Sequence, residues 1–174
     1  RPPAARPVGA GVGVPRPVPP RNGGSDGLVP AGLQHHWKAN FVRELKDAAI
    51  DAHIEHGPKL PAVNSTVHIY PINGACHRVP ADTTAFGHRD ANFATVIAGM
   101  WPDPSQNKAN IEWVRDYSDA TAPLSEAGGY INFMSQDDDN RVEANYGSNY
   151  QRLLDVKRKY DPDNLFRANQ NIKP

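Results

Sequence analysis

Residues 92–101 read NFATVIAGMW and residues 65–70 read STVHIY, and these two runs decide the fold class. Both are rich in β-branched side chains, and the shorter run alternates apolar with polar positions, as a half-buried strand does. Residues 71–74 (PING) are typical of a turn, so we predict further strands at 75–79 and 84–88. Strands joined by such short turns favour an antiparallel sheet.

Helical spacing of apolar residues appears on both sides of these strands. It predicts a first helix from about residue 35 to Gly57-Pro58, where glycine and proline end it. It predicts two more helices, at 107–120 and at 139–159, and Asp161-Pro162 prevents the last one from continuing. The expected fold is therefore α+β, an antiparallel sheet covered on one face by helices.

The composition of the 174-residue chain argues against several classes of function. Its 19 basic and 19 acidic residues balance, so nothing draws the chain to nucleic acid or to an anionic membrane. No apolar run approaches the roughly 20 residues that span a bilayer. The single cysteine, Cys76, excludes an intrachain disulfide and fits a reducing compartment such as the cytoplasm.

Residues 1–33 differ from the rest of the chain. They carry 8 of the 17 prolines and 7 of the 14 glycines, and they contain no aromatic residue. Such a segment buries too little apolar surface to offset its ordering entropy, so we predict a disordered or extended linker. Two functional alternatives stay open for it, a proline-rich ligand and a basic arm.

The last residues, 145–174, read NYGSNYQRLLDVKRKYDPDNLFRANQNIKP. The order Tyr-Gly-x-Asn-Tyr-x-Arg-Leu, Tyr-Asp-Pro-x-Asn-x-Phe and Asn-Gln-x-Ile-x-Pro resembles the C-terminal signature of the berberine-bridge-enzyme-like oxidases, within the vanillyl-alcohol-oxidase type of FAD proteins. Residues 85–101 begin with Ala-Phe-Gly-His-Arg-Asp and end with Trp, and they resemble a second block of that family. The resemblance covers residues 34–174 and is strongest from residue 129 onward.

The resemblance implies an FAD-dependent oxidoreductase that transfers a hydride from a small organic substrate to flavin, with oxygen as the reoxidant. Residues 34–128 would form its substrate-binding domain, and residues 129–174 would return to the FAD domain. The N-terminal FAD-binding domain would then be a missing partner, and the chain would be an inactive C-terminal fragment by itself. The alternatives are a truncated or degenerate ligand-binding domain without catalysis, and an interaction protein that uses the proline-rich arm.

Residues 129–134 (GYINFM) predict a short strand on which Tyr130 and Asn132 share one face. The Asn132 amide offers both a donor and an acceptor, which suits the pyrimidine edge of a flavin. The resemblance implies that FAD is contacted by Tyr130, Asn132, Tyr146 and Asn149. Many relatives carry a tyrosine that takes the substrate proton where this chain has Phe133, so the catalytic base is unassigned.

His68 and Tyr70 lie two residues apart on the strand predicted at 65–70, so they share a face. If that face is the flavin side, they line a substrate pocket, and Val67 faces the helices instead. The resemblance adds Phe133 and Ile97 to the substrate-binding residues. Ile97 aligns with a strand position at which several plant relatives carry Gln or Glu.

Several polar residues also have a simpler structural interpretation. Roles as core residue, turn cap or helix support are open for Tyr130, Asn132, Asn149, Arg152 and Asp161. His88 could act as a base, but the simpler interpretation pairs it and Arg89 with Asp90 or with the sheet edge. His53 and His56 are spaced to chelate a metal on a helix, but no third ligand is evident, so no metal site is predicted.

Overall fold

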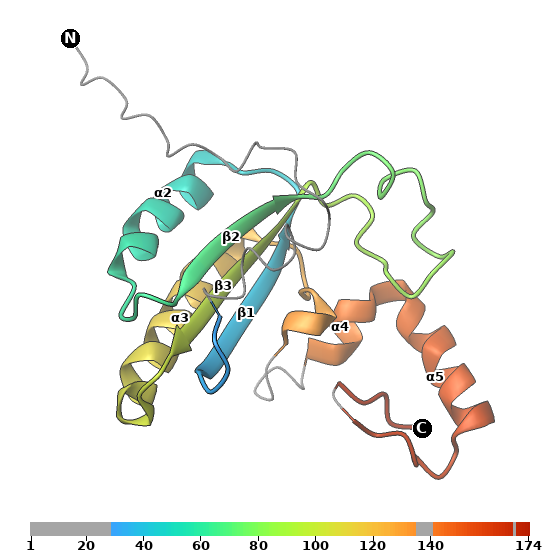
Figure 1. Ribbon diagram of the computed structural model, residues 1–174. Coiled ribbons are helices and arrows are strands. Elements are labelled where there is room, and N and C mark those ends of the chain that lie inside the picture. Colours follow the sequence, from blue (N-terminus) through green and yellow to red (C-terminus); the bar gives the residue numbers. More distant parts are fainter. Residues whose placement is uncertain (1–28, 135–140, 169) are drawn as a thin grey trace, which may run out of the picture. The chain divides into compact units, whose positions relative to one another are not determined.

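The computed structural model describes residues 29–134, 141–168 and 170–174, and residues 33–174 form one compact unit. The centre of this unit is a three-stranded antiparallel sheet in the order β1-β3-β2 (Figure 1). Its strands are β1 (Gln34–Val42), β2 (Thr66–Pro71) and β3 (Phe93–Trp101). The register places Val67 and Lys38 beside Ile97, and residues paired in this way share a face of the sheet.

One face of the sheet, here the helix face, is closed by α2 (Asp47–His56) and α3 (Asn107–Thr121). Helix α3 packs against β1 and β3, and α2 packs against α3 (Figure 1). The core of this layer consists of Val67, Ile97, Trp113, Val114 and Tyr117. Helix α3 comes so close to β3 at Gly99 that a Cβ there would lie 2.7 Å from Val114 Cγ2. The predicted α+β class, with helices on one face, is therefore confirmed.

The other face of the sheet, here the opposite face, carries a second apolar layer. It is formed by Ala39, Phe41, Ala94, Val96, Ala98 and Met100. Trp37, Tyr130 and Phe133 pack against this layer and are only partly buried. The opposite face therefore has a cover of separate rings rather than of helices.

The C-terminal part contains α4 (Val142–Tyr146) and α5 (Tyr150–Tyr160), joined by the 3-10 turn η7 (Gly147–Asn149). The Asp161 carboxylate stops α5 by accepting the backbone N–H groups of Leu165 at 2.7 Å and Phe166 at 3.1 Å. Lys157 hydrogen-bonds to that carboxylate, and this bond is the main reason that the pKa of Asp161 is lowered. Asp161 therefore has a structural role at the end of α5. Further 3-10 turns are η2 (Gly57–Lys59), η3 (Pro104–Gln106), η4 (Ala122–Leu124) and η5 (Ile131–Phe133).

The strands predicted at 65–70 and 92–101 and the helix predicted at 107–120 are confirmed as β2, β3 and α3. The helix predicted from residue 35 is wrong in its first part, because residues 34–42 form β1 and only Asp47–His56 is helical. Every residue from Lys38 to Val42 is buried, on whichever face it lies. This double burial hides the alternation of a strand and leaves Trp37 and Phe41 at a helical spacing.

The strands predicted at 75–79, 84–88 and 129–134 are wrong, since the first two are irregular loop and the third contains only η5. The predicted third helix is interrupted at Gly147, whose positive φ of 52° ends α4 before α5 begins. Its first residues, 139 and 140, lie outside the described residues. The linker predicted at 1–33 also lies mostly outside them.

Candidate functional site

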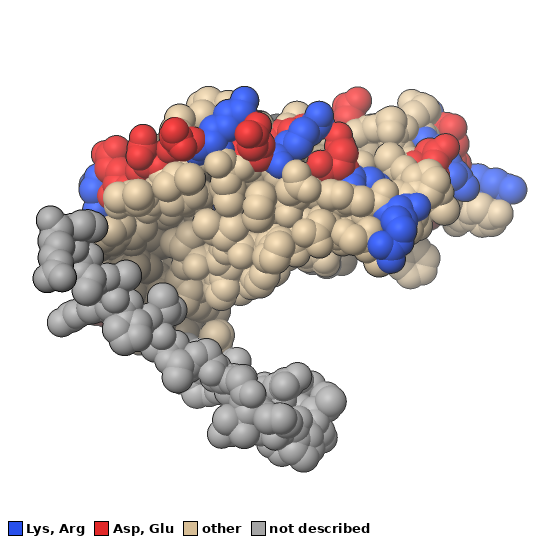
Figure 2. Space-filling view, turned by 90° about the horizontal axis from the view of Figure 1, so that it is seen from above, with Lys and Arg blue, Asp and Glu red and all other residues tan. Residues whose placement is uncertain are grey.

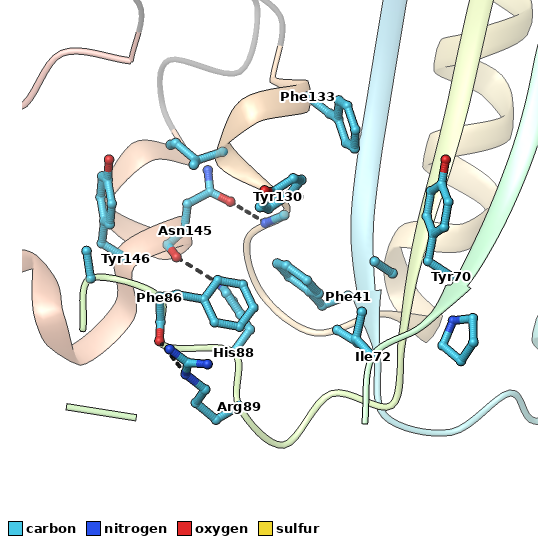
Figure 3. Close-up of a pocket in the computed structure, with 15 residues that line it drawn as sticks. Phe41, Tyr70, Ile72, Phe86, His88, Arg89, Tyr130, Phe133, Asn145 and Tyr146 are labelled. Atoms are coloured by element: carbon cyan, nitrogen blue, oxygen red, sulfur yellow. Dashed lines mark hydrogen bonds between the residues drawn. The ribbon is translucent and has the colours of Figure 1, made fainter. Parts of the chain in front are cut away.

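A pocket of about 840 Å³ opens on the opposite face of the sheet. It is lined by the strands, by the loop of residues 85–89 and by residues from 129–133 and 145–146 (Figure 3). Most of its lining side chains are apolar or aromatic. They are Phe41, Tyr70, Pro71, Ile72, Ala85, Phe86, His88, Arg89, Ala94, Gly129, Tyr130, Ile131, Phe133, Asn145 and Tyr146.

The segment that begins at Gly129 is held tightly against β1. A Cβ at Gly129 would lie 2.2 Å from the carbonyl oxygen of Ala39, so only glycine fits there. The Gly129 N–H donates to the side-chain oxygen of Asn145, and the Asn145 amide donates to the Arg141 carbonyl at 2.8 Å. Arg141 in turn donates to the Gly128 carbonyl at 2.6 Å. These bonds fix the wall that carries Tyr130 and Phe133.

His88 lies in the pocket wall with a fixed tautomer. Its ring stacks on Phe41 at a centroid distance of 4.4 Å, and its Nε2 lies 2.9 Å from the Asn145 carbonyl (Figure 3). A carbonyl only accepts, so Nε2 donates, and Nδ1 carries the lone pair of the neutral ring. Burial lowers the pKa of His88, although the Asn145 carbonyl and the charges of Asp90 and Glu126 oppose this shift. The ring is therefore neutral near pH 7.

Arg89 holds the loop together through hydrogen bonds to uncharged groups, so its guanidinium keeps its positive charge. Its Nε donates to the Phe86 carbonyl at 3.1 Å, and its Nη2 donates to Thr84 Oγ1 at 2.6 Å. Its guanidinium lies 4.8 Å from the centre of the Phe86 ring. Asp90, the partner considered for His88 and Arg89, instead forms an ion pair with Arg43 at 2.6 Å.

Four of the predicted site residues meet in this pocket, namely Tyr70, Tyr130, Phe133 and Tyr146. His68 lies beside them on the same face, since its ring stacks on Tyr70 at 5.4 Å and its Nε2 lies 2.7 Å from Thr66 Oγ1. Asn132 is exposed, and its amide donates to the Tyr130 hydroxyl at 2.9 Å. It lines a smaller neighbouring pocket of about 350 Å³ together with Trp37 and Phe133.

The remaining two predicted site residues, Ile97 and Asn149, line neither of these pockets. Ile97 is 1% exposed on the helix face, where it packs beneath α3, so its assignment to the substrate contacts is wrong. Asn149 is buried, and its amide donates to the Ala81 carbonyl at 2.8 Å. This bond holds the loop before Phe86, which is a structural role.

Sequence reasoning missed Phe41, Phe86 and Asn145 as pocket residues. Phe41 lies in a segment predicted as a helix. Asn145 belongs to the terminal signature, and it holds Gly129 through its side chain and His88 through its backbone carbonyl. Phe86 stands two residues before His88 in the quoted Ala-Phe-Gly-His-Arg-Asp run. Its aromatic ring in that polar run was the signal that could have found it.

Within the part of the chain that the structure describes, the remaining histidines and charged side chains do not form a second candidate site. His53 Nδ1 lies 2.6 Å from the Tyr117 hydroxyl, and His56 stacks on the same ring. Among the described residues, no three His, Cys, Asp or Glu side chains lie close enough to hold a metal.

None of the described helices has the length and apolar character needed to cross a membrane. In Figure 2 the Lys, Arg, Asp and Glu side chains gather along one margin, and other residues border the hollow.

Comparison with known proteins agrees with this geometry. Residues 129–173 match the family described as berberine and berberine like. The chain is 33% identical over 133 residues to the FAD-linked oxidoreductase YgaK of Bacillus subtilis, covering 76% of this chain and 29% of that protein. It is 32% identical over 160 residues to YvdP of the same organism, covering 91% of this chain and 33% of that protein.

Two solved structures show the same fold. A glycopeptide hexose oxidase complexed with teicoplanin has a TM-score of 0.71 at 26% identity, over 82% of this chain and 33% of its own. Berberine bridge enzyme from Eschscholzia californica has the same TM-score at 23% identity and the same two coverages.

The sequence similarity shows that the chain is homologous to FAD-linked oxidoreductases, and its fold matches the corresponding part of the solved structures. Within that class it belongs to the berberine-bridge-enzyme-like family. It spans only 29% and 33% of the length of the two curated relatives named above.

Proposed function

We propose that this chain supplies the substrate-binding face of an FAD-dependent oxidoreductase. The single observation that carries this proposal is the pocket on the opposite face, half-walled by the segment that matches the family. Residues 34–128 would bind the substrate, and residues 129–174 would lie against an FAD-binding domain. The reaction would remove a hydride from a carbon bearing oxygen or nitrogen in a small organic molecule.

The residues present fit the ring system of FAD better than its phosphates. Tyr130, Phe133 and the neighbouring apolar layer offer flat carbon surfaces that suit an isoalloxazine. The exposed Asn132 amide, steadied by the Tyr130 hydroxyl, could bond the polar edge of that ring. The guanidinium of Arg89 is engaged by the loop, so we expect the phosphates to be held by residues outside this chain.

A bound flavin would accept the hydride and would return to its oxidised form by passing two electrons to oxygen, which becomes hydrogen peroxide. The residues of this chain would orient the carbon that loses the hydride. Phe133 offers no proton acceptor, so the hydroxyl proton of the substrate would leave to water or to a group outside this chain.

A second candidate function is binding without catalysis, and Phe133 favours it because a proton acceptor is expected at that position. The complete reading frame that encodes this chain should be expressed, and the visible absorption of the purified protein should be recorded. We expect a yellow protein that releases peroxide with a substrate alcohol. A colourless protein would refute the oxidoreductase proposal, and a yellow protein that no alcohol reduces would favour the second candidate.

A further inference from the structure

The pocket wall is a set of aromatic rings that fix one another. The Phe41 ring meets Phe86 at 5.6 Å and Tyr130 at 6.2 Å, each at an interplanar angle of 74°. Tyr130 meets Phe133 in the same edge-to-face manner at 5.2 Å and 73°. These rings come from β1, from the loop and from the segment after Gly129 (Figure 3). Edge-to-face pairs are favourable contacts, so the wall is preorganised for a flat apolar guest.

The pocket offers no counter-charge to a cationic guest. No carboxylate is found among its described lining residues, and the Arg89 guanidinium in its wall donates only to uncharged partners, so it keeps its positive charge. His88 uses Nε2 for the Asn145 carbonyl, and its ring is neutral near pH 7 because burial lowers its pKa. A cation would therefore lose hydration without compensation and be repelled by Arg89, and a molecule rich in hydroxyls would leave most of them unpaired.

The size of the pocket and its rim narrow the choice further. Its volume of about 840 Å³ lies in the upper part of the range for small-molecule sites and is too large for one ring to fill. Tyr70 stands at the rim, 43% exposed, with its ring stacked on His68. Its hydroxyl can meet one polar group of the guest, while the rest of the guest stays among carbon atoms.

We propose, on the basis of the proposed function, that this pocket selects a substrate without a positive charge that has two or more aromatic rings and an alcohol group. The alcohol would face the rim at Tyr70, and the rings would lie against Phe41 and Phe86, which leaves Tyr130 and Phe133 to the flavin. Specificity would then come from ring contacts and from the absence of a carboxylate, rather than from hydrogen bonds to a sugar.

Binding to the 174-residue chain can be measured by calorimetry with three probes, in the absence of flavin. Naphthalenemethanol is the neutral aromatic alcohol, naphthylmethylammonium is its cationic analogue, and cellobiose represents sugars. We expect naphthalenemethanol to bind at least about tenfold more tightly than naphthylmethylammonium, which corresponds to about 1.4 kcal/mol. We expect no measurable heat from cellobiose. Equal or tighter binding of naphthylmethylammonium or cellobiose would overturn the proposal.

Two matched variants locate the site. Phe86→Ala should weaken naphthalenemethanol binding about tenfold, whereas Phe166→Ala removes a ring that is 77% exposed outside the pocket and should change nothing. Phe86→Leu keeps the apolar volume and loses the ring, so it serves if the alanine variant does not fold. Unchanged binding in the folded Phe86 variant would overturn the assignment of the site.

The two proposals fail in different ways. If naphthalenemethanol binds the chain but the complete protein holds no flavin, the ligand class stands and the oxidoreductase proposal falls. If the complete protein is yellow but the chain prefers cellobiose, the oxidoreductase proposal stands and the aromatic ligand class falls.

Discussion

The two faces of the sheet are both apolar, but they are covered in different ways. On the helix face, Ile97, Val114 and Tyr117 are at most 1% exposed, between the sheet and two helices of the same chain. A polar group joins these helices as well, because Trp113 Nε1 donates to the His56 carbonyl at 3.1 Å. On the opposite face the cover is a set of half-buried rings beside a pocket. The chain therefore closes one face with its own helices and leaves the other face partly open at the pocket.

Neighbouring residues of β3 show that one strand contributes side chains to both apolar layers. Val96 and Ile97 are each 1% exposed, but Ile97 is buried by α3, whereas Val96 lies in the layer covered by Tyr130 and Phe133. The cover over Val96 depends on a segment held by glycine and asparagine contacts rather than on a long helix. We therefore expect substitutions on the two faces to separate stability from ligand binding.

The largest expected effect concerns a truncation on the helix face. Ile97→Ala should lower the free energy of unfolding by about 3 kcal/mol, because it leaves a cavity under α3 that the sheet cannot fill. Tyr70→Ala, at an exposed position on the opposite face, should cost less than about 0.5 kcal/mol but should weaken naphthalenemethanol binding. Denaturant unfolding and calorimetry measure the two quantities. Equal losses of stability would contradict the division between the faces.

A smaller effect is expected where the ring cover is attached to the sheet. Gly129→Ala places a Cβ against the Ala39 carbonyl, so it should cost about 2 kcal/mol of stability and abolish pocket binding. Gly147→Ala is the matched control, because nothing lies within 4 Å of a Cβ there and only its φ of +52° is unfavourable. It should cost about 1 kcal/mol and leave binding intact. Binding that survives Gly129→Ala would show that the cover does not need this contact.

The sequence predicted the elements that carry a clear local signal. Helix α3 shows its buried stripe plainly, β2 separates Val67 from His68 and Tyr70 as expected, and β3 is rich in β-branched residues. Strand β1 was predicted as a helix because Lys38–Val42 is buried on both faces, which removes the alternation of a strand, and because β1 has only one β-branched residue, Val42. The loop over 75–90 was mistaken for strands because its hydrogen bonds run from side chains, especially that of Arg89, which local patterns do not reveal.

The candidate site could be predicted only where local signals or the family signature place a residue. Tyr70, Tyr130, Phe133 and Tyr146 were found from face-sharing and from the family signature, and all four line the pocket. Ile97 was placed on the wrong face, since its side depends on the register that pairs it with Val67. Register between strands about thirty residues apart is fixed by tertiary packing and cannot be read from either strand alone.

The histidines of the two faces provide a third test, through pH. Burial lowers the pKa of His53 below its ordinary value of 6.5, and it raises the pKa of its partner Tyr117 to about 12. The unfolded chain then binds the proton more readily, so the free energy of unfolding should fall as the pH drops below 6.5 and should not depend on His53 above it.

Unfolding curves across this pH range would check the sign of the effect, with His53→Gln as the variant that cannot titrate. The variant should show a shallower fall of stability with pH than the parent chain. The pH dependence of naphthalenemethanol binding should instead come from His88, which lies in the pocket wall. Its pKa is also lowered mainly by burial. A pH dependence of binding that disappears in His53→Gln would contradict the assignment of the two histidines to separate faces.

The smallest effect is expected at the sheet margin, outside both apolar layers. Arg43 forms ion pairs with Asp90 at 2.6 Å and with Glu126 at 3.3 Å, and the side chains of Arg43 and Asp90 are 58% and 68% exposed. Exposed pairs contribute little because water and salt screen them, so Arg43→Gln should cost less than about 1 kcal/mol. Added salt should reduce the difference further. Since the residue touches neither the α3 layer nor the aromatic rings, naphthalenemethanol affinity should be unchanged. A loss of affinity in this variant would mean that the margin holds the pocket wall in place, and that charge as well as ring packing separates the two faces.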